Sequence, residues 1–203
     1  MNVLVACEFS GVVRDAFRAR GHNAYSCDLE PSENMKYHLQ CDIRDVIYHS
    51  DWDLMIAHPP CTYLSVSGLH WNKKDEERAK KTEEALEFVK LLMDAPIDKI
   101  CIENPVSCIS SRIRKPDQII QPYEFGHDAS KRTCLWLKGL APLTINPDDR
   151  FPGRKVIYNG KERERWSNQT DSGQNVLGPS DNRSKLRSVT YLGIAEAMAR
   201  EWG

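Results

Sequence analysis

Short apolar runs alternate with polar or helical stretches along the first two thirds of this sequence, and this alternation restricts the fold more than any other feature. Runs typical of β-strands occupy residues 2–6, 23–27, 39–41, 53–57, 99–103 and 133–137. Patterns typical of helices follow residue 11 to about residue 20, and span about 74–93 and 188–202. Strands that alternate with helices form βαβ units. The sequence therefore predicts an α/β fold with a doubly wound, mostly parallel sheet.

The length of 203 residues fits one domain, residues 1–203, with a substantial core. The 28 basic and 29 acidic residues nearly cancel, so the overall charge does not by itself indicate a nucleic-acid partner. No apolar run has the length of a membrane span, and the N-terminus lacks a signal-peptide pattern. We therefore expect a cytoplasmic protein with no membrane partner.

The seven cysteines favour a reducing compartment and argue against a metal site. No two of them form a C-x-x-C pair, which disfavours zinc ribbons and thioredoxin-like sites. Cys7, Cys27, Cys101 and Cys134 fall within or just after predicted strands, where cysteine acts as a small buried hydrophobe. We expect most of these thiols to be structural and the protein to bind no metal.

Residues capable of chemistry follow several predicted strands directly. Asp28, Asp42, the segment Pro59-Pro60-Cys61 and Glu103 all lie at carboxyl ends of strands. In open α/β sheets, ligands bind along that edge. Each of these residues alone could be an ordinary turn former, but four such positions at one edge indicate a binding site.

Cys61 and Glu103 are the strongest candidates for catalysis. Two prolines fix the backbone after residues 53–57 and present Cys61 on a loop rather than in the core. Glu103 ends the next strand of the predicted sheet, so the two side chains face one pocket if their strands are neighbours. A thiol beside a carboxyl group is a workable pair of nucleophile and acid. We expect His58, just before the prolines, to orient the loop by a hydrogen bond rather than to act as a base.

Residues from about 146 to 187 differ in character from the rest of the chain. They are poor in apolar residues and contain an Asn159-Gly160 hairpin signal. Both a solvated surface loop and a phosphate-contacting insert are consistent with this composition. Nine basic side chains lie here: Arg150, Arg154, Lys155, Lys161, Arg163, Arg165, Arg183, Lys185 and Arg187.

Taken together, these motifs resemble those of the cytosine-5 DNA methyltransferases, whose hallmarks are a Pro-Cys loop and, one βα unit later, Glu-Asn-Val. The resemblance covers most of the chain, and the motifs occur in the family's order. Short chains of this kind occur among bacteriophage and prophage sequences. It implies a sheet of the S-adenosylmethionine-dependent methyltransferase (Rossmann-like) type. It further implies a DNA partner, no metal, and action in the cytoplasm of a bacterial host. The small basic insert at about 146–187 stands in place of the family's target-recognition domain.

The resemblance also implies roles for individual residues. Asp28 matches the acidic residue that holds the ribose hydroxyls of S-adenosylmethionine, and Asp42 matches the one at the adenine amino group. Lys131-Arg132-Thr133 resembles the Arg-x-Arg motif that touches the target base, and Ser188-Val189 resembles the start of the last motif. The implied catalytic residues are Cys61, Glu103 and Lys131. The implied cofactor-binding residues are Phe9, Ser10, Gly11, Asp28, Asp42, Ile43 and Pro59. The implied substrate-binding residues are Pro60, Asn104, Arg132 and Thr133.

The mechanism implied by the resemblance begins with addition of the Cys61 thiolate to carbon 6 of cytosine, while Glu103 stabilises or protonates N3. Carbon 5 then accepts the methyl group, and loss of its proton releases Cys61. A cytosine stacked in a duplex cannot reach such a pocket, so base flipping is expected.

Several departures from the family's pattern keep alternatives open. Val12, Val13 and Arg14 stand where the cofactor loop usually carries more glycines, and Lys131 and Thr133 stand where arginines are usual. Amino-methyltransferases use a related D/N-P-P-Y/F loop, and the same Cys-Glu chemistry could act on RNA or a nucleotide. A nucleic-acid-binding relative without catalysis is a further alternative. A zinc deaminase is not favoured, because Leu64 occupies the second cysteine position of its motif.

Overall fold

A seven-stranded sheet forms the centre of the molecule in the computed structural model, which describes residues 1–48, 51–178 and 188–203. The strand order is β3-β2-β1-β4-β5-β7-β6, and β7 alone runs antiparallel to its neighbours β5 and β6. The strands are β1 (Asn2–Ala6), β2 (Asn23–Asp28), β3 (His38–Gln40), β4 (Leu54–Ala57), β5 (Lys99–Pro105), β6 (Gln118–Ile120) and β7 (Thr133–Lys138). The predicted fold class, a doubly wound and mostly parallel sheet of Rossmann-like type, is confirmed.

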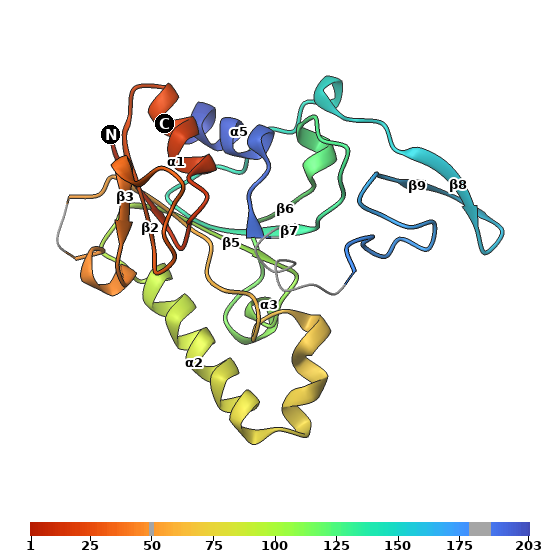
Figure 1. The fold of residues 1–203 in the computed structure, drawn as a ribbon, viewed down its shortest axis with the longest axis horizontal. Coiled ribbons are helices and arrows are strands. Elements are labelled where there is room, and N and C mark those ends of the chain that lie inside the picture. Colours follow the sequence, from red (N-terminus) through yellow and green to blue (C-terminus); the bar gives the residue numbers. More distant parts are fainter. Residues whose placement is uncertain (49–50, 179–187) are drawn as a thin grey trace.

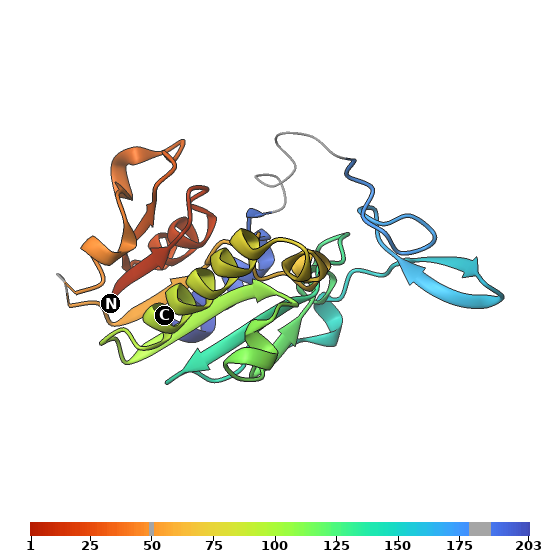
Figure 2. The same cartoon turned by 90° about the horizontal axis from the view of Figure 1, so that it is seen from below.

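Helices cover both faces of this sheet (Figures 1 and 2). Helices α1 (Val12–Ala19) and α5 (Leu192–Trp202) lie on one face, and α2 (Glu76–Met93) lies on the other. A short helix α3 (Ile109–Arg112) follows β5. The 3-10 segments are η1 (Met35–Tyr37), η2 (Ile43–Asp45), η3 (Val66–Lys73), η4 (Pro122–Phe125) and η5 (Pro147–Asp149).

The alternation of side chains along the central strands creates two separate hydrophobic cores. In β1, Val3 and Val5 pack with Phe17 of α1 and Met198 of α5. Leu4 and Ala6, one position out of phase, pack on the opposite face with the apolar side chains of α2. Because neighbouring residues of a strand point to opposite faces, a strand that is apolar throughout must be covered on both sides.

The predicted strands and helices are present, with differences at their ends. Helix α2 begins at Glu76 because the side chain of Asp75 accepts a hydrogen bond from the amide of Arg78 and caps the helix. Helix α5 begins at Leu192 rather than at residue 188, since Tyr191 has an extended backbone and serves as its N-cap. No helix in the described ranges combines the length and apolarity that a membrane span requires.

A separate hairpin projects from the body beyond the sheet (Figures 1 and 2). Strands β8 (Arg154–Tyr158) and β9 (Lys161–Arg165) pair antiparallel around Asn159 and Gly160. Both turn residues have positive φ, of 51° and 70°, as the predicted Asn-Gly turn requires. At the base of the hairpin, the ring of Trp166 stacks on Tyr123 with centroids 3.9 Å apart. Arg183, Lys185 and Arg187 of the predicted basic insert lie outside the described residues.

Candidate active site

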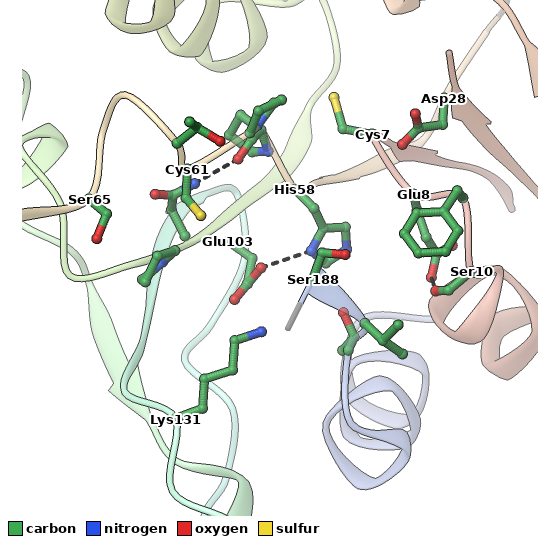
Figure 3. A pocket seen from close by; sticks show the side chains of 18 of the residues that line it. Cys7, Glu8, Ser10, Asp28, His58, Cys61, Ser65, Glu103, Lys131 and Ser188 are labelled. Carbon is green, nitrogen blue, oxygen red and sulfur yellow. Dashed lines mark hydrogen bonds and ion pairs between the residues drawn. The ribbon is translucent and has the colours of Figure 1, made fainter. Parts of the chain in front are cut away.

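A cavity of about 1270 Å³ opens along the carboxyl ends of β1, β2, β4 and β5. It also takes in the segment before β7 and the residues that precede α5. Most of the residues proposed from the sequence line it, and Figure 3 shows several of them facing one another. Those lining it are Phe9, Ser10, Asp28, Asp42, Ile43, Pro59, Pro60, Cys61, Glu103, Asn104, Lys131 and Arg132. Gly11 and Thr133 are not part of its wall.

The loop after β4 presents Cys61 to this cavity. The amide of His58 donates to the carbonyl of Ala6 in β1, at 2.9 Å, which continues the sheet by one residue. Asn104, from the end of β5, donates its side-chain amide to the Pro59 carbonyl at 2.8 Å. Cys61 itself is exposed, and its carbonyl accepts from the amide of Ser65 at 2.9 Å. The start of the loop, before Cys61, is therefore fixed to β1 and β5, the two strands that flank β4.

Helix α2 also holds the loop that carries Cys61. Arg78 donates to the carbonyls of Thr62 and Gly68, at 3.1 and 3.4 Å. The hydroxyl of Thr82 donates to the carbonyl of Tyr63 at 3.0 Å. From the sequence, the charged start of this helix is read most simply as a solvated face, but Arg78 makes specific contacts with the loop that follows Cys61.

Glu103 lies at the end of β5, beside β4, and only 8% of it is exposed. The ring nitrogen Nδ1 of His58 is 3.0 Å from its Oε2. Burial alone would raise the pKa of Glu103, but the charge of Lys131 and the hydrogen bonds from His58 and Thr133 outweigh it and hold the pKa below its ordinary value. Glu103 is consequently a carboxylate at neutral pH.

Glu8 is a site residue that the sequence analysis missed. Its carboxylate accepts from the amides of Val13 and Arg14, at 2.7 and 3.3 Å, and so occupies the N-terminus of α1. Only 4% of Glu8 is exposed, and this burial raises its pKa. The available signal was an acidic residue a few positions before a predicted helix, where carboxylates favour the amide groups of the first turn.

The turn between β1 and α1 explains the departure from a glycine-rich loop. Gly11 has φ of 74°, and a Cβ at this position would lie 2.2 Å from Nη2 of Arg14. The Arg14 guanidinium is fully buried and donates to the Ser26 hydroxyl and the Asn34 carbonyl, at 3.0 and 3.1 Å. Arg14 therefore fills the space beneath the turn and ties α1 to β2 and to η1.

The acidic residues after β2 and β3 differ in their surroundings. Asp28 accepts from the amide of Glu30 at 3.0 Å and lines the cavity. Asp42 caps η2 by accepting from the amide of Arg44 at 2.9 Å, and it also pairs with the Arg44 guanidinium. Both oxygens of the Asp42 carboxylate therefore contact Arg44, one its amide and the other its guanidinium.

Cys7 corrects one expectation from the sequence. Cys27, Cys101 and Cys134 are buried as expected, but Cys7 is only partly buried and has φ of 57°, and it lines the cavity. Burial and the nearby carboxylates of Asp28 and Asp42 raise the pKa of its thiol to about 12. Strand β1 ends at Ala6, so Cys7 belongs to the turn after the strand and its side chain is not part of the core. Among the described residues, no cluster of three or more His, Cys, Asp or Glu side chains has an arrangement that could hold a metal ion.

Comparisons with known proteins do not show a family for this chain. No protein-family model matches the chain, and no curated protein matches it. Among solved structures, it is similar to a candidate DNA modification methyltransferase encoded within a prophage of E. coli, with 16% identity and a TM-score of 0.42. The match covers 70% of this chain and 49% of that one, so the chain spans about half its length. A functional conclusion therefore depends on the side chains of the site.

Proposed function

We propose that this protein is a DNA methyltransferase that uses S-adenosylmethionine to methylate carbon 5 of cytosine through a covalent bond from Cys61. The observation that carries the proposal is the placement of Cys61 and Glu103 in one cavity. Cys61 is exposed on the loop after β4, and Glu103 lies near the carboxyl end of the neighbouring strand β5. Methylation of an unactivated ring carbon needs both a nucleophile and a group that manages the charge on the ring.

The residues around α1 fit S-adenosylmethionine better than a nucleotide phosphate. In nucleotide-binding sheets, the amide groups at the start of the first helix bind phosphate. Here the buried carboxyl group of Glu8 already accepts from the amides of Val13 and Arg14, so these donors are not available to a phosphate. A cationic sulfonium or ammonium group suits this environment. Asp28 ends β2 and lines the cavity, and we assign to it the ribose contact that an acidic residue makes in such folds.

When bound, S-adenosylmethionine supplies an electrophilic methyl group on its sulfonium. Phe9, Ile43 and Pro59 line the same part of the site and would contact its adenosyl part. Asp42 caps η2 and pairs with Arg44, so its main role is to fix the geometry of η2. By doing so it also fixes the position of Ile43, the first residue of η2. Ser10, whose hydroxyl donates to Glu8 at 3.3 Å, and Gly11 shape the turn that approaches the cofactor.

The chain's own residues perform the remaining steps. The Cys61 thiolate adds to carbon 6 of cytosine, and the electron pair of the 5,6 double bond moves into the ring. Glu103 would take up a proton from solvent when the base binds and donate it to N3, which moderates the charge that develops there. The charge of Lys131 also acts on Glu103. Carbon 5 would then accept the methyl group as the bond between that group and sulfur breaks, which leaves S-adenosylhomocysteine. Loss of the carbon 5 proton to a base or to solvent would re-form the 5,6 double bond and expel the Cys61 thiolate.

The site also accommodates an extruded base. A volume of about 1270 Å³ exceeds the roughly 300–1000 Å³ of common small-molecule pockets, which suits a cofactor together with a flipped nucleotide. Pro60, Asn104 and Arg132 line the part of the wall that adjoins Cys61 and Glu103. Thr133 is buried behind it and acts through Glu103.

The hairpin gives this single domain a surface for the DNA backbone. Lys161 and Arg163 lie on β9 and have no ion pair among the described residues, whereas Lys155 pairs with Glu162 and Arg154 with Asp171. Duplex DNA with a flipped cytosine is the proposed partner, and the cytoplasm of a bacterial host is the proposed location.

The proposal is tested by incubating the protein with radiolabelled S-adenosylmethionine and either cytosine-containing DNA or tRNA. Digestion to nucleosides and mass analysis then identify the labelled base. We expect label on carbon 5 of deoxycytidine, lost in Cys61→Ala and kept in Cys108→Ala, a cysteine outside the cavity. Label on an exocyclic nitrogen that survives Cys61→Ala would instead indicate an amino-methyltransferase. Label on tRNA alone would change the substrate, and binding of the cofactor with no transfer would contradict catalysis.

A further inference from the structure

His58 occupies a position in the site that no catalytic role described above uses. It is the first residue after β4 and comes directly before the two prolines that lead to Cys61. Its ring is nearly buried, with 8% of the side chain exposed, and it lies between the turn that carries Glu8 and the end of β5 (Figure 3). Nδ1 contacts Oε2 of Glu103 at 3.0 Å.

The other ring nitrogen of His58 has no hydrogen-bond partner in the described part of the chain, although it is buried. A second buried histidine provides the contrast. In His38, Nδ1 pairs with the Ser26 hydroxyl at 2.8 Å and Nε2 with the Glu30 carbonyl at 3.0 Å. Both nitrogens are satisfied there, as expected of a histidine that only fills and links the fold. In His58, by contrast, Nε2 is unsatisfied, which costs free energy in a buried site, and only Nδ1 makes a hydrogen bond, to Glu103.

Charged groups from two other segments, Glu8 and Lys131, lie near the pair of His58 and Glu103. Glu8 faces His58 from the turn before α1 (Figure 3). Glu103 faces it from β5, and Lys131 acts on Glu103 from the segment before β7. Without a donor at His58, the Glu103 carboxylate would keep the hydrogen bond from Thr133 but lose its second donor, and it could then turn toward Lys131 and form a direct ion pair with it.

We infer that His58 is the positioning residue of Glu103: it donates Nδ1–H to Oε2 and holds the carboxylate toward the base rather than toward Lys131. This role rests on the proposed function, since it assigns how Glu103 is presented to N3. The hydrogen bond to a buried carboxylate also defines which ring nitrogen carries a proton, because a carboxylate accepts and Nδ1 must donate.

Kinetics of three variants of the full chain test the inference. Loss of a hydrogen bond to a charged group predicts a fall of about 10- to 100-fold in the single-turnover rate of His58→Ala, with KM values for DNA and cofactor within about twofold of wild type. His58→Asn places a side-chain amide near the position of Nδ1 and should recover most of the rate. His70→Asn, an exposed histidine outside the cavity, is the matched control and should leave the rate unchanged.

A wild-type rate in His58→Ala would overturn the inference, and so would a rate in His58→Asn as low as in His58→Ala. A second measurement does not depend on methyl transfer. Nitrogen-15 NMR of the imidazole groups in the free protein should show a proton on Nδ1 of His58, with the resonance assigned by its loss in His58→Asn. A bare Nδ1 would overturn the role even in an active enzyme. If no substrate is methylated but Nδ1 is protonated, the proposed function fails while the contact between His58 and Glu103 stands.

Discussion

Cys7 and Cys61 line the same cavity, but their surroundings give the two thiols different chemistry. Cys61 is exposed on a loop, whereas burial and the carboxylates of Asp28 and Asp42 raise the pKa of Cys7 to about 12. The thiolate is the reactive form of cysteine. We predict that iodoacetamide at about pH 8 modifies Cys61 many times faster than Cys7. Peptide mass spectrometry over time measures both rates, and equal rates would contradict this assignment of the nucleophile.

Glu103 makes the stability of the fold depend on pH in a defined direction. Its pKa is lowered in the native protein, so its contribution to stability is present above the unfolded value, near 4.5, and is lost as the pH falls through the native value. We predict that Glu103→Gln lowers the free energy of unfolding by about 1–3 kcal/mol at neutral pH. The difference from wild type should shrink as the pH falls below about 4.5.

Urea denaturation of both proteins at several pH values measures this difference. Glu8, whose pKa is raised, has the opposite dependence: its contribution is full below the unfolded value and lost as the pH rises through the native one. Because Glu8 is present in both proteins, its effect cancels in the comparison. A difference that stays constant or grows toward low pH would contradict the ionised state of Glu103.

Some residues of the cavity could be predicted from the sequence, because local patterns mark them. Cys61 and Glu103 follow apolar strands and carry distinctive neighbours, so their approach to one cavity could be predicted. The contact of His58 with Glu103 joins residues 45 positions apart. The role of Glu8 depends on how closely its carboxylate approaches the amides of α1. Such contacts arise from tertiary packing, and no spacing rule in the sequence specifies them.

Helix α2 and the loop after Cys61 act as one unit through Arg78. Its guanidinium binds the carbonyls of Thr62 and Gly68. We predict that Arg78→Ala lowers the rate of methyl transfer by about tenfold and stability by about 1 kcal/mol, because the loop gains freedom around Cys61. Lys80→Ala, on the solvent-facing side of the same helix with 79% of its side chain exposed, is the control. Equal rates for the two variants would show that the loop is held by other contacts.

Strands and helices with a clear apolar period were predictable, and the short elements were not. β6 has three residues and a single buried one, Ile120, so its sequence has no period to detect. Its extended form depends on pairing with β7. The start of α5 was not predictable either, since Nε2 of His127, 66 positions away in the sequence, accepts from the amide of Gly193 in the first turn at 2.8 Å.

The molecule as a whole separates its proposed cofactor edge from a projecting basic hairpin. We predict that the double variant Lys161→Gln/Arg163→Gln binds duplex DNA more weakly and lowers the slope of log K against log salt by about 2, as expected for two lost phosphate contacts. Lys90→Gln, at the C-terminal end of α2 and thus on the opposite edge of the sheet, is the matched control. Fluorescence anisotropy over a salt series measures both slopes. An unchanged slope in the double variant would remove the hairpin from the DNA interface.

The covalent bond from Cys61 to cytosine is the central claim, and trapping it tests the claim most directly. In DNA that carries 5-fluorocytosine, the carbon 5 position has fluorine instead of a proton, so elimination of Cys61 cannot follow methyl transfer. We predict that the denatured protein, after incubation with this DNA and S-adenosylmethionine, retains the oligonucleotide plus one methyl group on the peptide that contains Cys61. An intact protein mass without adduct, under conditions in which ordinary cytosine DNA is methylated, would contradict covalent catalysis by Cys61.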